Sequence, residues 1–106
     1  MRLALCCFTA LVLAVGPASS QPRGSAQVGQ KLVQENCSSC HAIGRTGESP
    51  LRIARPFREL HTRYPVESLA EALAEGIVTG HPTMPEFRLD PDQIEHMIAY
   101  FKMLER

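Results

Sequence analysis

The five residues Cys37-Ser38-Ser39-Cys40-His41 decide the fold of this chain. Two thiols lie three positions apart, and an imidazole follows the second thiol directly. At this spacing both thiols can reach the two vinyl groups on one side of a porphyrin as thioethers, while the imidazole lies under the ring and reaches the iron. The pattern C-x-x-C-H is accordingly a signature of c-type haem attachment. It predicts one haem c per chain, bound covalently through Cys37 and Cys40, with His41 as the proximal iron ligand.

The first twenty residues predict a secretory signal peptide. A positive start is followed by an uncharged run of 13 residues, Leu3 to Val15, and small residues at Ala18 and Ser20 suit cleavage after Ser20. Thirteen apolar residues fall short of the roughly 20 that span a bilayer as a helix, so we expect cleavage and not an uncleaved anchor. Residues 1–20 are the expected signal peptide, and residues 21–106 are the expected mature domain.

The mature chain is short and balanced in charge. Subtracting 20 residues from 106 leaves 86, with Cys37 and Cys40 as its two cysteines. A chain of this length forms one domain, and domains this small often need a cofactor or a cross-link for stability. The full chain has 11 basic and 11 acidic residues, which argues against a nucleic-acid binder.

The sequence alone leaves three other functions of the two cysteines open. A redox-active dithiol of the thioredoxin kind needs β-α-β units, which the pattern lacks. A zinc site would need a further ligand, but His61, His81 and His96 do not follow finger spacing. A structural disulfide is compatible with export. The signature, the export signal and the lack of another mature cysteine favour haem.

The spacing of apolar residues predicts an all-α domain with two long loops. Expected helices run from a cap at Ser25 to about Glu35, over 57–64, over 66–75, and from a cap at Asp90 to the C-terminus. Loops are expected over 37–57 and 77–89, where glycine and proline gather. The predicted inward residues of the first helix are Val28, Leu32 and Val33. The predicted apolar surroundings of the haem are Leu51, Ile53, Phe57, Leu60, Leu69, Leu73, Ile77, Phe87, Ile98 and Phe101.

Met84 is the predicted sixth ligand of the iron. It lies in the second loop between Pro82 and Pro85, which stiffen the segment and leave little ordering entropy to lose. His81 is the rival ligand, and an open sixth site is the other alternative. Met97 belongs to the apolar stripe of the last helix and is a predicted core residue, whereas His61 and His96 are expected to face solvent.

With these residues in place, the mature chain resembles a class I monohaem cytochrome c of the short bacterial, periplasmic type over most of residues 25–104. Gly29 lies where that family keeps a glycine for close packing of the first and last helices, and Tyr100 resembles the aromatic that meets it. Met84-Pro85 resembles the axial methionine followed by proline. The loop after His41 lacks the usual Gly-Pro pair, and we expect a backbone carbonyl near Pro50 to accept the His41 ring N–H.

The resemblance implies three to four helices wrapped around one covalently attached haem, over residues 21–106. It implies a one-electron carrier, not an enzyme, in a periplasmic electron-transport chain, with iron cycling between Fe(II) and Fe(III). A dedicated cytochrome subunit of a periplasmic dehydrogenase and, as a third reading, a haem-based sensor or peroxidase-like enzyme are the alternatives. Expected partners are redox proteins, namely a dehydrogenase, an oxidase or a cytochrome complex. No nucleic acid and no stable membrane insertion after cleavage are expected, and the protein is expected to be a monomer.

The zero net charge conceals an uneven distribution. Residues 45–63 contain five arginines against two glutamates, a net of +3, and residues 66–95 contain seven acidic residues against one arginine, a net of −6. These segments are either simply solvated faces or a dipole that orients docking on a redox partner.

Overall fold

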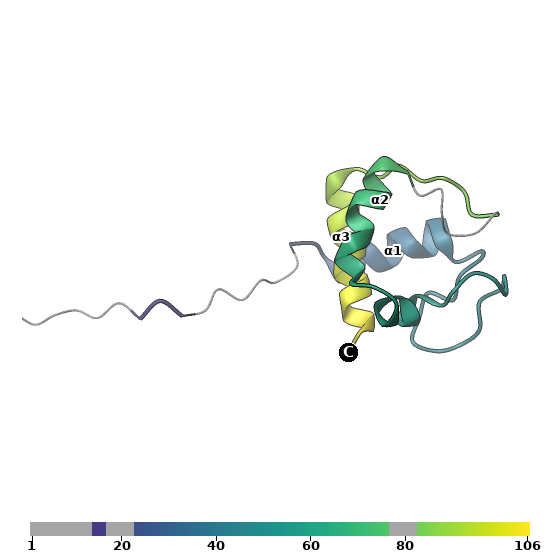
Figure 1. Ribbon diagram of the computed structural model, residues 1–106, viewed down its shortest axis with the longest axis horizontal. Coiled ribbons are helices and arrows are strands. Elements are labelled where there is room, and N and C mark those ends of the chain that lie inside the picture. The colour runs from purple at the N-terminus through teal and green to yellow at the C-terminus, as the bar shows by residue number, and fades with distance from the viewer. Residues whose placement is uncertain (1–13, 17–22, 77–82) are drawn as a thin grey trace, which may run out of the picture.

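The computed structural model describes residues 14–16, 23–76 and 83–106 (Figure 1). The elements in chain order are α1 (Ala26–Cys37), the 3₁₀ helices η1 (Phe57–Thr62) and η2 (Val66–Ser68), α2 (Leu69–Glu75) and α3 (Pro91–Leu104). No strand occurs within the described ranges, which confirms the all-α prediction. Most of the expected signal peptide, as well as Ile77 and His81 of the second loop, lie outside the described residues.

Helix α1 begins where the sequence predicts and extends two residues further than expected. The Ser25 hydroxyl accepts a hydrogen bond from the Val28 N–H at 3.3 Å, which satisfies one of the unpaired donors at the start of the helix. Val33 is fully buried, as expected, but the prediction for Val28 was wrong, since this side chain is 42% exposed. The helix ends at Cys37, so the first thiol belongs to its last turn.

Helices α1 and α3 cross at Gly29, and Figure 1 shows α1 passing behind α3. A Cβ atom on Gly29 would collide with the His96 carbonyl and would lie 3.0 Å from the Tyr100 Cβ atom. Gly24 lies just as closely against the Glu95 carbonyl. The predicted role of Gly29 and Tyr100 in helix packing is therefore confirmed.

Helix α3 provides the largest part of the core. It begins at Pro91 after Asp90, whose N–H donates to Gln93 Oε1 at 3.0 Å, as the capping-box pattern predicts. The Phe57 and Phe101 rings meet edge to face, with centroids 5.1 Å apart. The buried side chains of α3 are Ile94, Met97, Ala99, Tyr100, Phe101 and Leu104.

The predicted helix over 66–75 is divided into two elements. Its first turn, after Pro65, is the 3₁₀ helix η2, and the α-helix begins only at Leu69. Short 3₁₀ turns are common at the start of α-helices. The helix ends at Glu75 and is capped by Gly76, whose φ of +99° lies in the region that favours glycine.

The long loop between α1 and η1 is fixed to the end of α3. The Tyr100 hydroxyl donates to the Ile43 carbonyl at 2.6 Å. The Arg45 guanidinium donates to the Met103 carbonyl at 2.8 Å and to the Arg106 carbonyl at 2.6 Å. These bonds satisfy carbonyls at the C-terminal end of a helix, where a cation is favourable. The loop that follows His41 is thus bound to the end of α3 through the buried Tyr100 and through the exposed Arg45.

Candidate haem site

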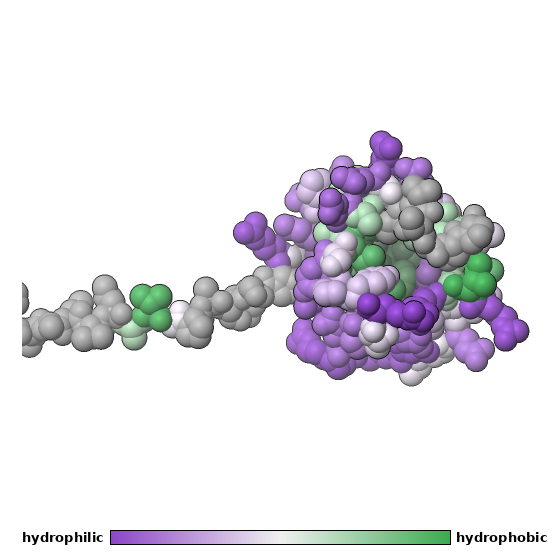
Figure 2. Space-filling model, viewed as in Figure 1, coloured by the Kyte–Doolittle hydropathy of each residue, from purple (hydrophilic) through white to green (hydrophobic). Residues whose placement is uncertain are grey.

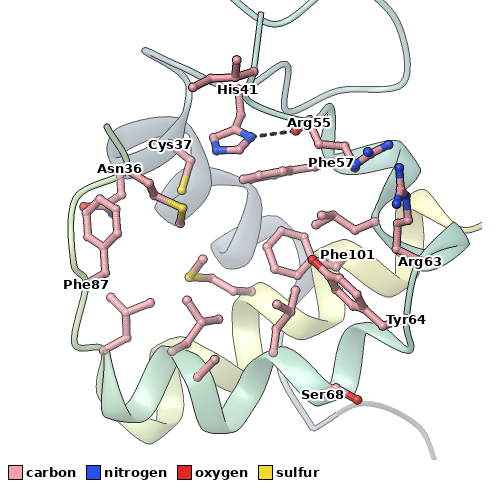
Figure 3. Close-up of a pocket in the computed structure, with 18 residues that line it drawn as sticks. Asn36, Cys37, His41, Arg55, Phe57, Arg63, Tyr64, Ser68, Phe87 and Phe101 are labelled. Carbon is pink, nitrogen blue, oxygen red and sulfur yellow. Dashed lines mark hydrogen bonds between the residues drawn. The ribbon is translucent and has the colours of Figure 1, made fainter. Parts of the chain in front are cut away.

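A cavity of about 810 Å³ lies between the two loops and the helices α1, α2 and α3 (Figure 3). Figure 2 shows a hollow with apolar residues inside it and mostly hydrophilic residues around it. Its lining is mainly apolar, so the cavity suits a large and mostly apolar group. The lining residues are Asn36, Cys37, His41, Ile53, Arg55, Phe57, Leu60, Arg63, Tyr64, Ser68, Leu69, Ala72, Leu73, Met84, Phe87, Leu89, Met97 and Phe101.

The His41 ring projects into this cavity from the turn that follows α1. Its backbone N–H donates to the Cys37 carbonyl at 2.9 Å, so the motif continues the helical path for one more turn. The ring lies against Phe57, with centroids 4.7 Å apart. The motif therefore brings an imidazole into the same cavity that Cys37 lines.

A backbone carbonyl fixes the orientation of the His41 ring. Nδ1 lies 2.7 Å from the Arg55 carbonyl oxygen, and a carbonyl can only accept, so Nδ1 carries the proton in this contact. The lone pair of the neutral ring is then on Nε2, which is the arrangement that a metal-binding histidine needs. The prediction that this acceptor lies near Pro50 was wrong, because the loop turns back through the Phe57 N–H···Ala42 carbonyl bond of 2.9 Å and brings Arg55 beside the ring.

The two cysteines hold different positions, and no disulfide joins them. Cys37 is half-buried and lines the cavity, whereas Cys40 is half-buried outside the lining, with its Sγ atom 3.8 Å from Ser39 Oγ. Burial, and next the neighbouring Cys40, raise the pKa of the Cys37 thiol to about 11. Redox-active cysteine pairs depend on a lowered thiol pKa, so the Cys37 site does not resemble a redox-active dithiol.

Met84 and Met97 both line the cavity, from different elements. Met84 is half-buried on the segment before α3, and Met97 is 3% exposed on α3, as its place in the apolar stripe predicts. The described residues contain no group of three or more His, Cys, Asp or Glu side chains that could hold a metal ion. A zinc site built from His61 or His96 therefore has no support in this part of the chain.

The remaining histidines differ from each other. His61 is exposed, as expected. His96 was expected to face solvent, but it is half-buried, and its Nδ1 accepts a hydrogen bond from the Ser25 N–H at 2.8 Å. The expectation for His96 was wrong because the crossing of α1 over α3 brings the start of α1 against its ring.

Most of the predicted apolar wall is present. Phe57, Leu60, Leu73 and Phe101 are buried and line the cavity, and Leu69 and Phe87 line it from half-buried positions. Ile53 is 59% exposed, yet it lines the cavity as well. Leu51 and Ile98 are half-buried and do not line it, so those two predictions were wrong.

One edge of the cavity is polar. Figure 3 shows Arg55, Arg63 and Tyr64 on the side away from Asn36, Cys37 and Phe87. Arg55 also lies within 3.3 Å of Glu59, one turn further along. Because haem carries two vinyl groups on one side and two propionates on the other, this distribution of thiol and guanidinium groups suits haem in one orientation.

Comparison with known proteins agrees with this fold. A family model described as "Cytochrome C oxidase, cbb3-type, subunit III" matches residues 24–101. Cytochrome c6 of Bryopsis maxima is 31% identical over 80 residues, which cover 73% of this chain and 89% of the relative. Cytochrome c6 of Nostoc sp. is 35% identical over 75 residues, which cover 68% of this chain and 64% of the relative. No solved structure matches the chain.

These matches and the all-α fold around the cavity define the class of protein as the c-type cytochromes. The chain belongs to the cytochrome c family, and it is a small monohaem c-type cytochrome. The resemblance read from the sequence is thereby confirmed. Among the described helices, none combines the length and the apolar character needed to cross a membrane.

Proposed function

We propose that this protein is a one-electron carrier in a periplasmic electron-transport chain. In this proposal haem c is attached through Cys37 and Cys40, and His41 and Met84 are the axial ligands. When bound, haem c supplies a single iron that alternates between Fe(II) and Fe(III). The observation that carries the proposal is one cavity lined jointly by Cys37, His41 and Met84. The homology to two cytochromes c6 supports it further.

Two filled axial positions leave no place on the iron for a substrate, which is why we assign electron transfer and no enzymatic reaction. His41 is oriented by the Arg55 carbonyl, so its ring needs no rearrangement when the oxidation state changes. A methionine thioether favours Fe(II) and raises the reduction potential. The apolar lining acts in the same direction, since it disfavours the additional charge of Fe(III).

The substitution Met84→Ala tests this assignment. We expect the variant to lose the sulfur-to-iron charge-transfer band of the oxidised protein and to have a lower reduction potential, because the thioether stabilises Fe(II). Met97→Leu is the matched control, since Met97 also lines the cavity but is predicted to be only a core residue. An unchanged band and potential in Met84→Ala would exclude Met84 as the sixth ligand. Carbon monoxide binding to the native ferrous protein at neutral pH would then favour a haem sensor or a peroxidase-like enzyme.

A bound subunit of a larger complex is the second candidate, and the family model favours it, because its description names a subunit of an oxidase. A dedicated subunit of a periplasmic dehydrogenase belongs to the same possibility. Purification of the native protein at low ionic strength decides between them: a free carrier elutes alone as a monomer, and a subunit elutes with a large catalytic partner.

Export is part of the proposal and has its own test. The signal peptide predicted over residues 1–20 implies a mature chain that begins at Gln21. The mass of the protein extracted from whole cells with detergent should equal that of residues 21–106 plus one haem. A mass that includes residues 1–20 would instead indicate an uncleaved anchor.

A further inference from the structure

Both peptide groups beside the His41 Cα atom are hydrogen-bonded to the loop that follows. The Cys40 carbonyl, in the peptide group before His41, accepts from the Leu51 N–H at 3.1 Å. The Ala42 N–H, in the peptide group after His41, donates to the Ser49 hydroxyl oxygen at 3.0 Å. Of these two bonds, only the second depends on a side chain.

The Ser49 contact acts directly on a backbone angle of His41. A peptide group is planar, so the direction of the Ala42 N–H sets the ψ angle of His41. No further residue lies between cause and effect, because this angle belongs to His41 itself. The two peptide groups together determine where the Cα–Cβ bond of His41 points, and the ring extends from that bond.

Ala42 also connects the Ser49 contact to the acceptor of the ring. Its carbonyl accepts from the Phe57 N–H at 2.9 Å, and the Phe57 ring lies against His41. Arg55, whose carbonyl lies 2.7 Å from His41 Nδ1, is joined to Phe57 through Pro56, a residue with a fixed φ (Figure 3). The N–H of Ala42 thus holds the backbone of the ligand, and its carbonyl holds the segment that orients the ring.

We propose that Ser49 is a positioning residue for the His41 imidazole. Its hydroxyl fixes the peptide group after His41 and thereby keeps the ring in the orientation in which Nδ1 meets the Arg55 carbonyl. Ser49 is half-buried and does not line the cavity, so it acts through the backbone of His41 and not on the haem. The inference rests on the proposed axial ligation by His41.

Four substitutions in the holoprotein test the contact. Ser49→Ala and Ser49→Val remove the hydroxyl, Ser49→Thr keeps it in the shape of valine, and Thr46→Ala removes an exposed hydroxyl from the same loop. We expect hydrogen exchange at the Ala42 amide to be about tenfold faster in the first two variants and unchanged in the other two. The haem methyl proton resonances of the oxidised protein depend on the direction of the axial imidazole plane. They should move in the first two variants only, and a loss of stability alone would not move them.

Methyl resonances at their wild-type positions in both Ser49→Ala and Ser49→Val would overturn the proposal, and so would an equal displacement in Ser49→Thr. If neither variant without the hydroxyl yields holoprotein, the wild type decides. Its Ala42 amide should be protected from exchange relative to the Thr46 amide, and equal protection would refute the contact.

Hyperfine-shifted ring protons of His41 in the wild type test the ligation itself. Their absence would refute the proposed function. Their presence, together with unchanged methyl resonances in Ser49→Ala, would refute only the role of Ser49.

Discussion

At the scale of single residues, the position and the orientation of the His41 ring depend on both a local motif and a distant backbone carbonyl. The C-x-x-C-H spacing brings the imidazole to the end of α1, where it enters the cavity. The Arg55 carbonyl, 14 residues away, then determines which ring nitrogen carries the proton. A defined orientation of this ring in the cavity thus requires both the helix that delivers the ring and the loop that returns to it.

Tyr100 is the residue for which the structure predicts a pH effect. Burial raises the pKa of its phenol above the ordinary value of about 10, although the nearby Arg45 acts in the opposite direction. The folded state therefore holds this proton more tightly than the unfolded state. The resulting stabilisation is complete below the unfolded pKa and is lost as the pH rises through the folded pKa.

We expect Tyr100→Phe to lower the free energy of unfolding by about 1 kcal/mol at neutral pH, because the Ile43 carbonyl loses its donor. Above pH 10 the variant should lose stability less steeply than the wild type. Denaturant unfolding between pH 7 and pH 11 measures both effects, with Tyr64→Phe as the control for a more exposed phenol. Parallel curves for the wild type and Tyr100→Phe would contradict this prediction.

Arg63 provides a second prediction at this scale. Its cation lines the edge of the cavity, where it disfavours the additional positive charge of Fe(III). Arg63→Gln should lower the reduction potential on the order of tens of millivolts, since a unit charge near the surface interacts by roughly 1 kcal/mol or less. Arg52→Gln is the matched control, because Arg52 is exposed and does not line the cavity. Equal shifts in the two variants would show that only the net charge matters.

At the scale of elements, the fold depends on the crossing of α1 and α3. These two helices also form part of the cavity wall, because α1 ends at Cys37 and α3 contributes Met97 and Phe101 to the lining. A change in the separation of the two helices therefore alters both the core and the cavity. Gly29 sets this separation, since the His96 carbonyl occupies the space that a side chain would need.

We expect Gly29→Ala to destabilise the protein by roughly 1–3 kcal/mol, the cost of adding a methyl group to a closely packed contact. Gly44→Ala serves as its control, because no atom lies within 4 Å of that Cβ position. Thermal unfolding of the two holoproteins measures the difference. Equal stability of the two variants would mean that the helices separate without cost.

At the scale of the whole molecule, charge is distributed unevenly around a neutral total. Several of the charges serve contacts within the fold, such as Arg45 at the end of α3 and Lys102 beside Glu67 at 2.5 Å. Others in the arginine-rich segment 45–63, such as Arg52, are exposed and do not line the cavity. These exposed charges are available to a partner surface, or they serve only hydration.

If the charge asymmetry orients docking, electron-transfer rates with the physiological partner should change with ionic strength, because salt screens charges separated by more than about 8 Å at physiological concentration. Arg52→Gln and Glu71→Gln should then change the rate at low salt in opposite directions, since they remove opposite charges from exposed positions. Rates that are independent of salt would leave hydration as the role of these faces.

The sequence by itself determined the features that depend on neighbouring residues. The motif at 37–41, the caps at Ser25 and Asp90 and the stop at Gly76 are local patterns, since each depends on hydrogen bonds or backbone angles within a few residues. The packing role of Gly29 was also predictable, but only through the resemblance to a family. Met84 could be selected as a candidate ligand because prolines flank it.

Only the tertiary structure decided which distant groups meet. The Arg55 carbonyl beside His41, the polar edge with Arg63 and Tyr64, and the Glu86 side chain against Gly76 all depend on the paths of long loops. Val28 and Val33 are both valines of α1, yet the crossing with α3 buries Val33 and leaves Val28 exposed. The physical reason is that residue spacing fixes which face of a helix is apolar, whereas its neighbours depend on how the whole chain closes around the cavity.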